Sequence, residues 1–361
     1  MRLLALLAGV SIILVILWDG FEAVVLPRRV ARRLRLVRLV VRATWRFWAA
    51  VGRRLPAGHR RETYLSYYGP LLLIVLLATW AAGLVFGFAL VHWGLGSQLS
   101  DPEWPVSFAT DLYISGTTFF TLGLGDVAPR SWAARFVTVA EAGIGFGFLA
   151  LVVGYLPVFY NAFAQRETRI TMLDEWAGSP PTAAELLWRL ARDKSVPAMA
   201  AFLREWEQWC AELLESHLSY PVLAYFRSQH GNQSWLAGLT MVLDTCAFVL
   251  AAVEEAPRRE AWLTFAMARH TAVDLCQVFE TPPTLLPADR LPAADLTRMR
   301  TMLREAGLSV HEDADMEQRL AESRRMYEPY VHALSIRLLV PLPGWIPVPG
   351  ARDNWQRSPW R

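Results

Sequence analysis

The residues with the clearest chemical potential are 117–126, which read Thr-Thr-Phe-Phe-Thr-Leu-Gly-Leu-Gly-Asp. A cation that leaves water needs a ring of oxygens in place of its hydration shell, and backbone carbonyls can supply this ring when they all point inward. Gly123 and Gly125 permit the unusual backbone angles that this requires. Thr121 adds a hydroxyl oxygen at the inner end, and Asp126 adds a carboxylate at the outer mouth. Gly-rich turns with Thr and Asp are common in soluble proteins too, so the prediction of a cation-conducting loop depends on the flanking segments.

Three apolar segments are long enough to cross a bilayer, which takes about twenty apolar residues. They cover Leu3–Val25, Tyr68–Trp93 and Trp132–Tyr160, all within the first 160 residues, where the excess of hydrophobic residues in this 54% hydrophobic chain is concentrated. The loop 117–126 lies between the second and third segments. Irregular backbone is tolerated at membrane depth only where it lines a water-filled path or is buried in protein. We therefore expect an all-α membrane protein with three transmembrane helices, a re-entrant pore loop and a cytoplasmic α-helical domain.

These features together resemble bacterial potassium channels with a two-helix pore domain, preceded here by an extra N-terminal membrane helix. The family filter reads T-V-G-Y-G-D, and residues 121–126 read T-L-G-L-G-D. Leu122 replaces Val, and Leu124 stands where the family has Tyr or Phe. The resemblance implies cation conduction, with potassium at the filter as the only metal ion, whereas Leu124 leaves the ranking of potassium over sodium open.

The resemblance also implies roles for residues in and behind the loop. The ion would be bound by the backbone carbonyls of Thr121, Leu122, Gly123, Leu124 and Gly125. Thr117 and Thr118 fall where the family has hydroxyl residues behind the filter, at the end of a pore helix expected over 106–120. One filter strand cannot surround an ion, so four copies are required and a homotetramer is expected.

Three residues of the third apolar segment have candidate roles. Glu141 is ionisable at membrane depth, which favours a position behind the filter; an ion pair with Arg135 at the interface is the alternative. Gly145 lies about where the resembling channels have a gating hinge, but a glycine there can also serve close helix packing. Pro157 is expected to bend the cytoplasmic end of the helix, because it removes a backbone hydrogen bond.

Charge sets the expected orientation. Twelve arginines and no acidic residue lie between Arg28 and Arg61, and strongly positive short loops stay in the cytoplasm. The N-terminus and the filter loop would then lie outside, and everything after Tyr160 inside, in a multi-pass protein of a bacterial inner (plasma) membrane. The outer mouth would be negative, with carboxylates from Asp101, Glu103, Asp111 and Asp126.

The basic segment has arginine at every third position, namely Arg29, Arg32, Arg35 and Arg38. This favours an amphipathic helix that binds anionic lipid at the inner leaflet, with Trp45, Phe47 and Trp48 at the interface. A voltage-sensing helix is the alternative, although the upstream segment offers only Asp19 and Glu22 as acidic partners. Nucleic-acid binding is not expected for a segment tethered between two membrane helices.

The expected domains are an N-terminal membrane anchor helix (1–26), a basic amphipathic segment (27–63), a pore domain (64–161), a linker (162–181) and a cytoplasmic helical domain (182–361) with a Pro-rich tail. The first segment could instead be a cleaved signal peptide. However, no small-x-small cleavage site follows it, which favours a retained helix.

The C-terminal part has helical spacing of apolar residues. A capping box of Thr182 and Glu185 predicts a helix start, and Ser195 with Pro197 predicts another helix that runs toward His217. Further helices are expected over 234–255, 257–279, 294–306 and 312–334, and prolines make 338–350 an extended strap.

Several site types have no support in the C-terminal part. The sequence has no G-x-G-x-x-G after a strand and no H-E-x-x-H, so neither a nucleotide cofactor nor metalloprotease chemistry is predicted. The cysteines are expected to be buried thiols and the histidines to be packed or surface residues; they are Cys210, Cys246, Cys276, His217, His230 and His270.

The sequence therefore predicts a subunit of a tetrameric channel that conducts potassium passively, with no enzyme activity and no cofactor. Two alternatives stay open. One is a membrane-anchored signalling or scaffold protein with a non-conducting pore-like domain, and the other is a membrane enzyme that uses the helical C-terminal domain. The gating stimulus and the ligand or protein partner of residues 182–361 are not specified by the sequence.

Overall fold

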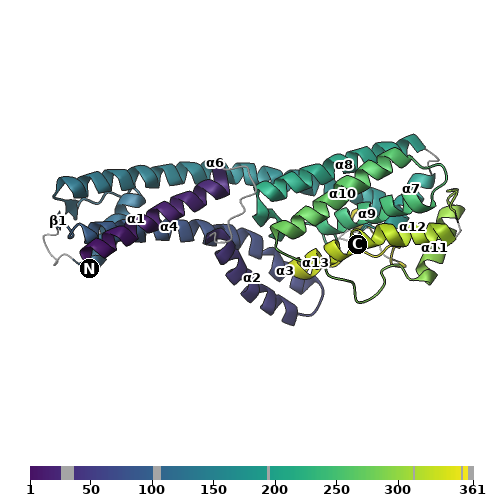
Figure 1. Ribbon diagram of the computed structural model, residues 1–361, viewed down its shortest axis with the longest axis horizontal. Coiled ribbons are helices and arrows are strands. Elements are labelled where there is room, and N and C mark those ends of the chain that lie inside the picture. The colour runs from purple at the N-terminus through teal and green to yellow at the C-terminus, as the bar shows by residue number, and fades with distance from the viewer. Residues whose placement is uncertain (26–35, 101–106, 193–195, 312–313, 351–352, 357–361) are drawn as a thin grey trace. The chain divides into compact units, whose positions relative to one another are not determined.

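The computed structural model describes residues 1–25, 36–100, 107–192, 196–311, 314–350 and 353–356. These residues are mostly helical, as expected of an all-α membrane protein, and they form two compact units that are considered separately (Figure 1). The pore unit comprises Met1–Arg54 and Tyr67–Asn161, and the helical unit comprises Leu55–Ser66 and Ala162–Arg361. Residues 55–66 thus belong with the C-terminal part of the chain.

The pore unit is built from long apolar helices. Its elements are α1 (Arg2–Gly20), the π-helical turn η1 (Phe21–Val25), α2 (Leu36–Arg54), α4 (Tyr68–Gly94), β1 (Leu99–Ser100), α5 (Phe108–Phe119), β2 (Ala128–Pro129) and the first part of α6 (Trp132–Ala177). The two short strands pair antiparallel, with Leu99 opposite Pro129. The residues expected as a linker, 162–181, are helical through Ala177 because α6 continues past the end of the pore unit.

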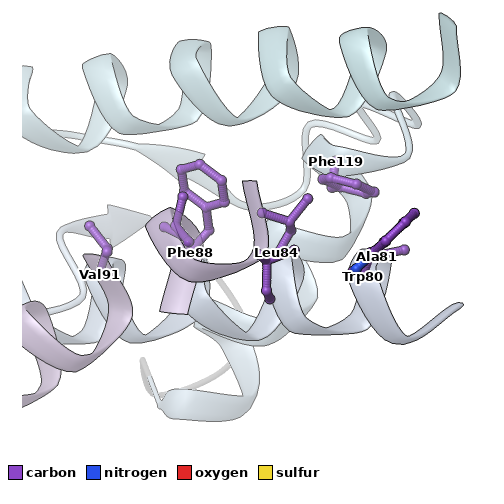
Figure 2. Packing of buried hydrophobic residues seen from close by; sticks show 8 residues of the cluster. Trp80, Ala81, Leu84, Phe88, Val91 and Phe119 are labelled. Atoms are coloured by element: carbon purple, nitrogen blue, oxygen red, sulfur yellow. The ribbon is translucent and has the colours of Figure 1, made fainter. Parts of the chain in front are cut away.

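Glycines allow α1 and α4 to approach closely. A Cβ on Gly9 of α1 would lie 2.6 Å from the carbonyl oxygen of Gly87, and one on Gly83 would lie 2.3 Å from Cδ1 of Ile16. Gly83 and Gly87 are four residues apart and therefore share one face of α4, the small-xxx-small spacing by which membrane helices pack without a hydrophobic driving force. Large side chains fill the space beside this contact, and Figure 2 shows Trp80, Leu84 and Phe88 of α4.

A buried carboxylate, that of Asp19, hydrogen-bonds the end of α1 to α4 and α2. Asp19 is 4% exposed, and its two oxygens accept hydrogen bonds from Nε1 of Trp80 (2.9 Å) and from the backbone N–H of Leu36 at the start of α2 (3.1 Å). A buried carboxylate is costly unless it is paired or hydrogen-bonded. Asp19, weighed as a partner for a voltage-sensing segment, is thus bonded to α4 and to the first residue of α2.

Helix α2 packs on the start of α4 through aromatic rings. Trp45, expected at the lipid interface, is instead 3% exposed, with its ring centroid 4.7 Å from that of Tyr68. Phe47 is 71% exposed. Arg38 lies on α2, whereas Arg29, Arg32 and Arg35 lie outside the described residues.

The helical unit consists of α3 (His59–Ser66), the end of α6, α7 (Ala183–Arg192), α8 (Val196–Ser219), the 3-10 turn η2 (Pro221–Tyr225), α9 (Trp235–Ala252), α10 (Arg258–Val278), α11 (Ala293–Glu305), α12 (Ala314–Arg325), α13 (Glu328–Leu338) and η3 (Asn354–Gln356). Thr182 caps α7, because its Oγ1 accepts from the N–H of Glu185 at 3.3 Å. The single helix expected over 312–334 is two helices, since Pro329 in the first turn of α13 has no N–H with which to continue α12.

Helix α9 is the centre of the helical unit. Four helical segments of the described chain are long and apolar enough to cross a membrane: Arg2–Val24, His59–Gly94, Trp132–Ala177 and Trp235–Ala252. The last of these is α9, and 94% of it is buried inside the fold. Its apolar surface is therefore covered by protein, as in a core helix. Cys246 of α9, like Cys210 and Cys276, is a buried free thiol, as expected.

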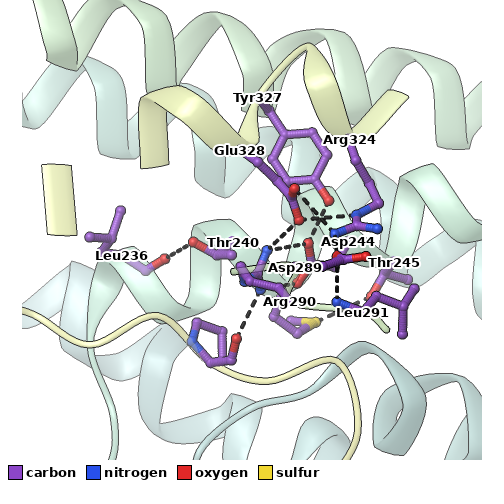
Figure 3. A network of polar contacts seen from close by, with 12 residues as sticks. Leu236, Thr240, Asp244, Thr245, Asp289, Arg290, Leu291, Arg324, Tyr327 and Glu328 are labelled. Atoms are coloured by element: carbon purple, nitrogen blue, oxygen red, sulfur yellow. Dashed lines mark hydrogen bonds and ion pairs between the residues drawn. The ribbon is translucent and has the colours of Figure 1, made fainter. Parts of the chain in front are cut away.

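A buried ionic network joins α9 to three later segments (Figure 3). Arg290 donates to both carboxylate oxygens of Asp244 (2.6 and 3.1 Å) and to the Pro343 carbonyl of the Pro-rich strap (2.8 Å). The hydroxyl of Tyr327 also donates to Asp244, and Arg290 pairs with Glu328 at 3.2 Å. Because removal of one partner would leave a buried charge uncompensated, this network fixes the strap and the α12–α13 junction against α9.

His217 is one of the histidines expected to be packed, and it is fully buried in α8. Its Nδ1 lies 2.8 Å from the carbonyl oxygen of Leu213, and its ring centroid lies 4.9 Å from that of Trp235. Burial lowers the pKa of His217 to about 3, and the charge of nearby Arg166 adds to this effect. The imidazole is therefore neutral throughout the physiological pH range.

The low pKa of His217 predicts a pH-dependent stability. Between its ordinary value of about 6.5 and the folded value of about 3, the unfolded chain binds a proton at this residue that the folded chain does not bind. The free energy of unfolding should therefore fall as the pH falls through this range, by up to about 1.4 kcal/mol per pH unit from this residue. Urea unfolding of the full chain in detergent at a series of pH values would measure it.

The control is a second histidine. His217→Gln should flatten the pH dependence, whereas His270→Gln should leave it unchanged, because the His270 side chain is 60% exposed. Equal slopes for the wild type and His217→Gln would contradict the prediction.

Candidate ion-binding loop

The helix that leads into the loop begins with a capping box formed by Ser107 and Thr110. Ser107 accepts a hydrogen bond from the N–H of Thr110, and the Thr110 hydroxyl accepts one from the N–H of Ser107, both at 3.4 Å. This reciprocal capping box satisfies two N–H groups that a helix start leaves free. Helix α5 therefore begins at Phe108, close to the expected start at 106, and ends at Phe119.

The end of α5 holds the loop through backbone bonds. The carbonyl of Thr117 accepts from the N–H groups of Leu122 (2.8 Å) and Gly123 (3.4 Å), and the carbonyl of Thr118 accepts from Thr121 (3.0 Å). The Thr117 hydroxyl donates to Ile114 within α5 (3.0 Å). Thr117 and Thr118, expected to support the loop through hydroxyl groups, thus contact it through their carbonyls.

The sign of φ changes at every residue from Thr121 to Gly125. φ is +56° at Thr121, +58° at Gly123 and +81° at Gly125, whereas Leu122 and Leu124 between them do not have positive φ. In keeping with such alternation, which can turn successive N–H groups to one side of the chain, the N–H groups of Leu122 and Gly123 share the Thr117 carbonyl as acceptor. Thr121 is β-branched, and a left-handed conformation costs such a residue about 1–2 kcal/mol. This strain is the kind of feature that accumulates at functional sites.

The side chains of the loop are uncovered within one chain. Leu122 and Leu124 are 62% and 63% exposed. As a leucine, Leu124 cannot form the aromatic contacts of the family, and most of this residue is exposed in the single chain.

Glu141 lies at the meeting point of three helices. Its carboxylate on α6 contacts the Ser115 hydroxyl of α5 and lies 3.7 Å from Nε2 of His92 on α4. All three side chains are buried. The alternative ion pair with Arg135 is wrong, because the Arg135 guanidinium instead lies over the Trp132 ring at 5.9 Å. The sequence gave no signal for the contacts of Glu141 with Ser115 and His92.

Of the four carboxylates expected at an outer mouth, two lie within the described residues, and they differ in exposure. Asp126 is exposed, and its Oδ2 accepts a hydrogen bond from the Tyr113 hydroxyl of α5 at 2.7 Å, which lowers the pKa of the carboxyl. Asp111, by contrast, is fully buried, and its carboxylate accepts a hydrogen bond from the Ser97 hydroxyl at 2.7 Å. Asp101 and Glu103 lie outside the described residues. The bond from Tyr113 joins residues 13 apart and was not anticipated.

Gly145 is a site of close packing. A Cβ at this position would lie 2.1 Å from the carbonyl oxygen of Phe119, the last residue of α5. The other glycines nearby, Gly143, Gly147 and Gly154, have no atom within 4 Å of such a Cβ. Pro157 lies inside α6, which is continuous on both sides of it. The structure therefore gives Gly145 the packing role that the sequence left open beside the hinge.

Comparison with known proteins points to the same part of the chain. Residues 73–161 match an ion channel family, and they include most of α4, all of α5, the loop and the first part of α6. The match supports an ion-channel-like function for the pore unit.

One relative extends the comparison beyond the pore unit. An uncharacterised membrane protein of Bacillus subtilis (strain 168), YdjJ, is 26% identical over 200 residues, which is 55% of this chain and 57% of that protein. The chain thus spans little more than half the length of this curated relative. No solved structure matches.

The packing of Gly145 predicts a position-specific effect. Gly145→Ala should destabilise the pore unit, because the new Cβ would displace α6 from the end of α5; overpacking of this kind costs about 1–3 kcal/mol. Thermal unfolding of the full chain in detergent would measure it. Gly143→Ala, two residues away on the open face, should have little effect. Equal destabilisation by the two substitutions would refute the packing role.

The contact between Ser115 and Glu141 predicts energetic coupling. Loss of the buried hydroxyl leaves the carboxylate without a donor, at a cost of about 1–3 kcal/mol. A double-mutant cycle of Ser115→Ala and Glu141→Gln should therefore give a coupling energy above about 0.5 kcal/mol in unfolding. Thr138→Ala with Glu141→Gln is the control, since the Thr138 hydroxyl bonds only to Ala134 of its own helix (2.9 Å). Additive effects of Ser115→Ala and Glu141→Gln would argue against the contact.

Proposed function

We propose that this chain is the subunit of a homotetrameric cation channel of a bacterial inner membrane, and that it conducts potassium passively. The proposal is carried by one observation. A T-x-G-x-G-D loop between two apolar helices has positive φ at every second residue, Thr121, Gly123 and Gly125. In the proposed channel, the carbonyls of residues 121–125 replace the hydration shell of the ion. The match of residues 73–161 to an ion channel family supports it.

The uncovered surface of the loop supports a closed oligomer. One strand offers carbonyls from one side only, so a ring needs several copies arranged by cyclic symmetry. Leu122 and Leu124 are exposed in the single chain, and neighbouring subunits would cover them. The same holds for the outward face of α6, where large apolar side chains are exposed at Phe136, Val139 and Phe146. Four copies of the loop close the proposed pore.

The proposed topology has three membrane-spanning helices. Helices α1, α4 and the first part of α6 span the bilayer, and α5 with its loop re-enters from outside. The N-terminus lies outside, and arginines Arg42, Arg46, Arg53 and Arg54 keep α2 in the cytoplasm. Arg38, with Arg29, Arg32 and Arg35, meets anionic lipid headgroups. The helical unit, including α9, is cytoplasmic, and the protein has no enzyme activity, cofactor or nucleic-acid partner.

Potassium is the proposed permeant ion despite the change at Leu124. The aromatic brace of the family is replaced by contacts from behind and beside the loop, namely the Tyr113–Asp126 hydrogen bond (2.7 Å) and the Glu141–Ser115 contact. Selectivity for potassium depends on the number and the field of the coordinating carbonyls, and both are set by the backbone of residues 121–125.

Ion flux into vesicles tests the proposal. The purified full chain should carry potassium down its gradient, and Gly123→Ala should reduce the flux strongly, because alanine is strained at φ +58° by about 1 kcal/mol or more. Gly231→Ala is the matched control, since a Cβ there meets open space outside the pore unit. Sodium flux measured in parallel gives the ion ranking.

Two results would overturn the channel function. Equal flux in the wild type and Gly123→Ala would show that the loop does not conduct, and absence of flux in both would favour the scaffold or enzyme alternatives. A monomeric or dimeric mass in mild detergent would exclude the ring. Sodium flux equal to potassium flux would overturn the proposed selectivity but not the pore.

A further inference from the structure

Residues 221–228, which comprise η2 and the three residues after it, contact α6 where this helix enters the helical unit. Nη1 of Arg166 donates to the carbonyl of Leu223 and Nη2 donates to the carbonyl of Phe226, both at 2.9 Å. The Phe226 ring lies 5.6 Å from that of Phe163, measured between centroids. The side chain of Arg166 is 2% exposed and is paired with Glu167 at 2.9 Å. The Arg166 guanidinium is therefore buried and hydrogen-bonded through all three of its nitrogens, and such bonds are strong because the donor is charged.

The next residue of the same segment contacts α3. Nη2 of Arg227 donates to the carbonyls of Leu338 (2.7 Å) and Leu339 (3.2 Å), and its Nη1 lies 3.7 Å from Oε2 of Glu62. Glu62 belongs to α3, which ends at Ser66, and α4 begins at Tyr68. The two helices are thus separated by a single residue, Tyr67.

Two adjacent residues, Phe226 and Arg227, therefore contact two different helices. Phe226 accepts from Arg166 of α6, and Arg227 pairs with Glu62 of α3. Consecutive Cα atoms are about 3.8 Å apart, so both contacts oppose a displacement of α6 relative to α3. Helix α6 is the helix that follows the loop 121–126. Helix α3 leads through Tyr67 into α4, which is followed by α5 and the loop.

The two contacts differ in strength. The Arg166 guanidinium is buried and has two carbonyl acceptors, whereas the Glu62 carboxylate is 47% exposed and makes a longer ion pair. Water and salt screen a half-exposed pair far more than a buried one. A displacement of α6 would therefore separate Arg227 from Glu62 first.

We propose that residues 221–228 form a clamp by which the helical unit restrains the pore, and that the clamp releases at Glu62. This inference rests on the proposed channel function, which it deepens by assigning a regulatory contact to the helical unit. Arg166, Arg227 and Glu62 act as positioning residues, because they contact neither the ion nor the loop. Whatever moves η2 within the helical unit changes the restraint on both helices at once.

The test removes one charge from the clamp. Glu62→Gln in the full chain should raise potassium flux into vesicles about two- to fivefold, the factor that corresponds to the loss of a half-exposed ion pair. It should also speed hydrogen exchange in residues 59–66, with no change in α9. Because Glu62 is half-exposed, this substitution leaves the core intact. Glu205→Gln is the matched control: Glu205 pairs with Arg169 of α6 at 3.9 Å, is 63% exposed and lies outside residues 221–228.

The outcomes separate the clamp from the channel. Faster flux and faster exchange in Glu62→Gln, with neither in Glu205→Gln, support the clamp. Faster exchange with unchanged flux would overturn its regulatory role, and unchanged exchange would overturn the contact itself. Absence of flux in every variant would overturn the channel function and the regulation together, while the exchange data would still show whether Glu62 holds α3 in place.

Discussion

The constraint on which the pore unit depends is the backbone of residues 121–125. A chain that changes hand at every residue cannot form the regular ladder of a strand or the i to i−4 bonds of a helix, so other elements must hold it. Here the end of α5 does so, because the Thr117 and Thr118 carbonyls accept the N–H groups of the loop. The strain at Thr121 (φ +56°) is tolerated only while α5 itself is fixed. The capping box at Ser107 and the contact of Gly145 with Phe119 fix its two ends.

In the helical unit the main constraint is the burial of an unusually apolar helix. Helix α9 has the composition of a membrane span, and its neighbours cover it almost completely. The ion pair of Asp244 and Arg290 inside this apolar environment is costly to form and more costly to break. It fixes the position of the Pro-rich strap and of the α12–α13 junction, where apolar contacts alone would allow other arrangements.

Local signals in the sequence predicted local structure well. The capping residue Thr182 and the apolar spacing placed α7 and α9, and the separation of Gly123 from Gly125 anticipated the positive φ values. What the sequence did not predict concerns partners distant in the chain. Trp45, expected at the lipid interface, packs on Tyr68, and Glu141 contacts Ser115, 26 residues away, rather than Arg135, the alternative that the sequence left open. Periodicity gives the depth of a residue in the membrane and the face of its helix. The choice among partners at that depth depends on how helices are rotated against one another, which no single-helix pattern contains.

Helix α6 illustrates how packing limits where a pore helix can bend. At Gly145 the helix touches the Phe119 carbonyl so closely that even a methyl group is excluded, and a bend there would pull the end of α5 away from the loop it supports. Farther along, Pro157 lacks the N–H that would bond to the carbonyl four residues earlier, so the helix is weakest at that point. Arg166 then anchors the same helix in the helical unit. Between a fixed point at Gly145 and a fixed point at Arg166, bending is cheapest at Pro157. A bend at Pro157 would therefore leave the contact between Gly145 and the Phe119 carbonyl in place.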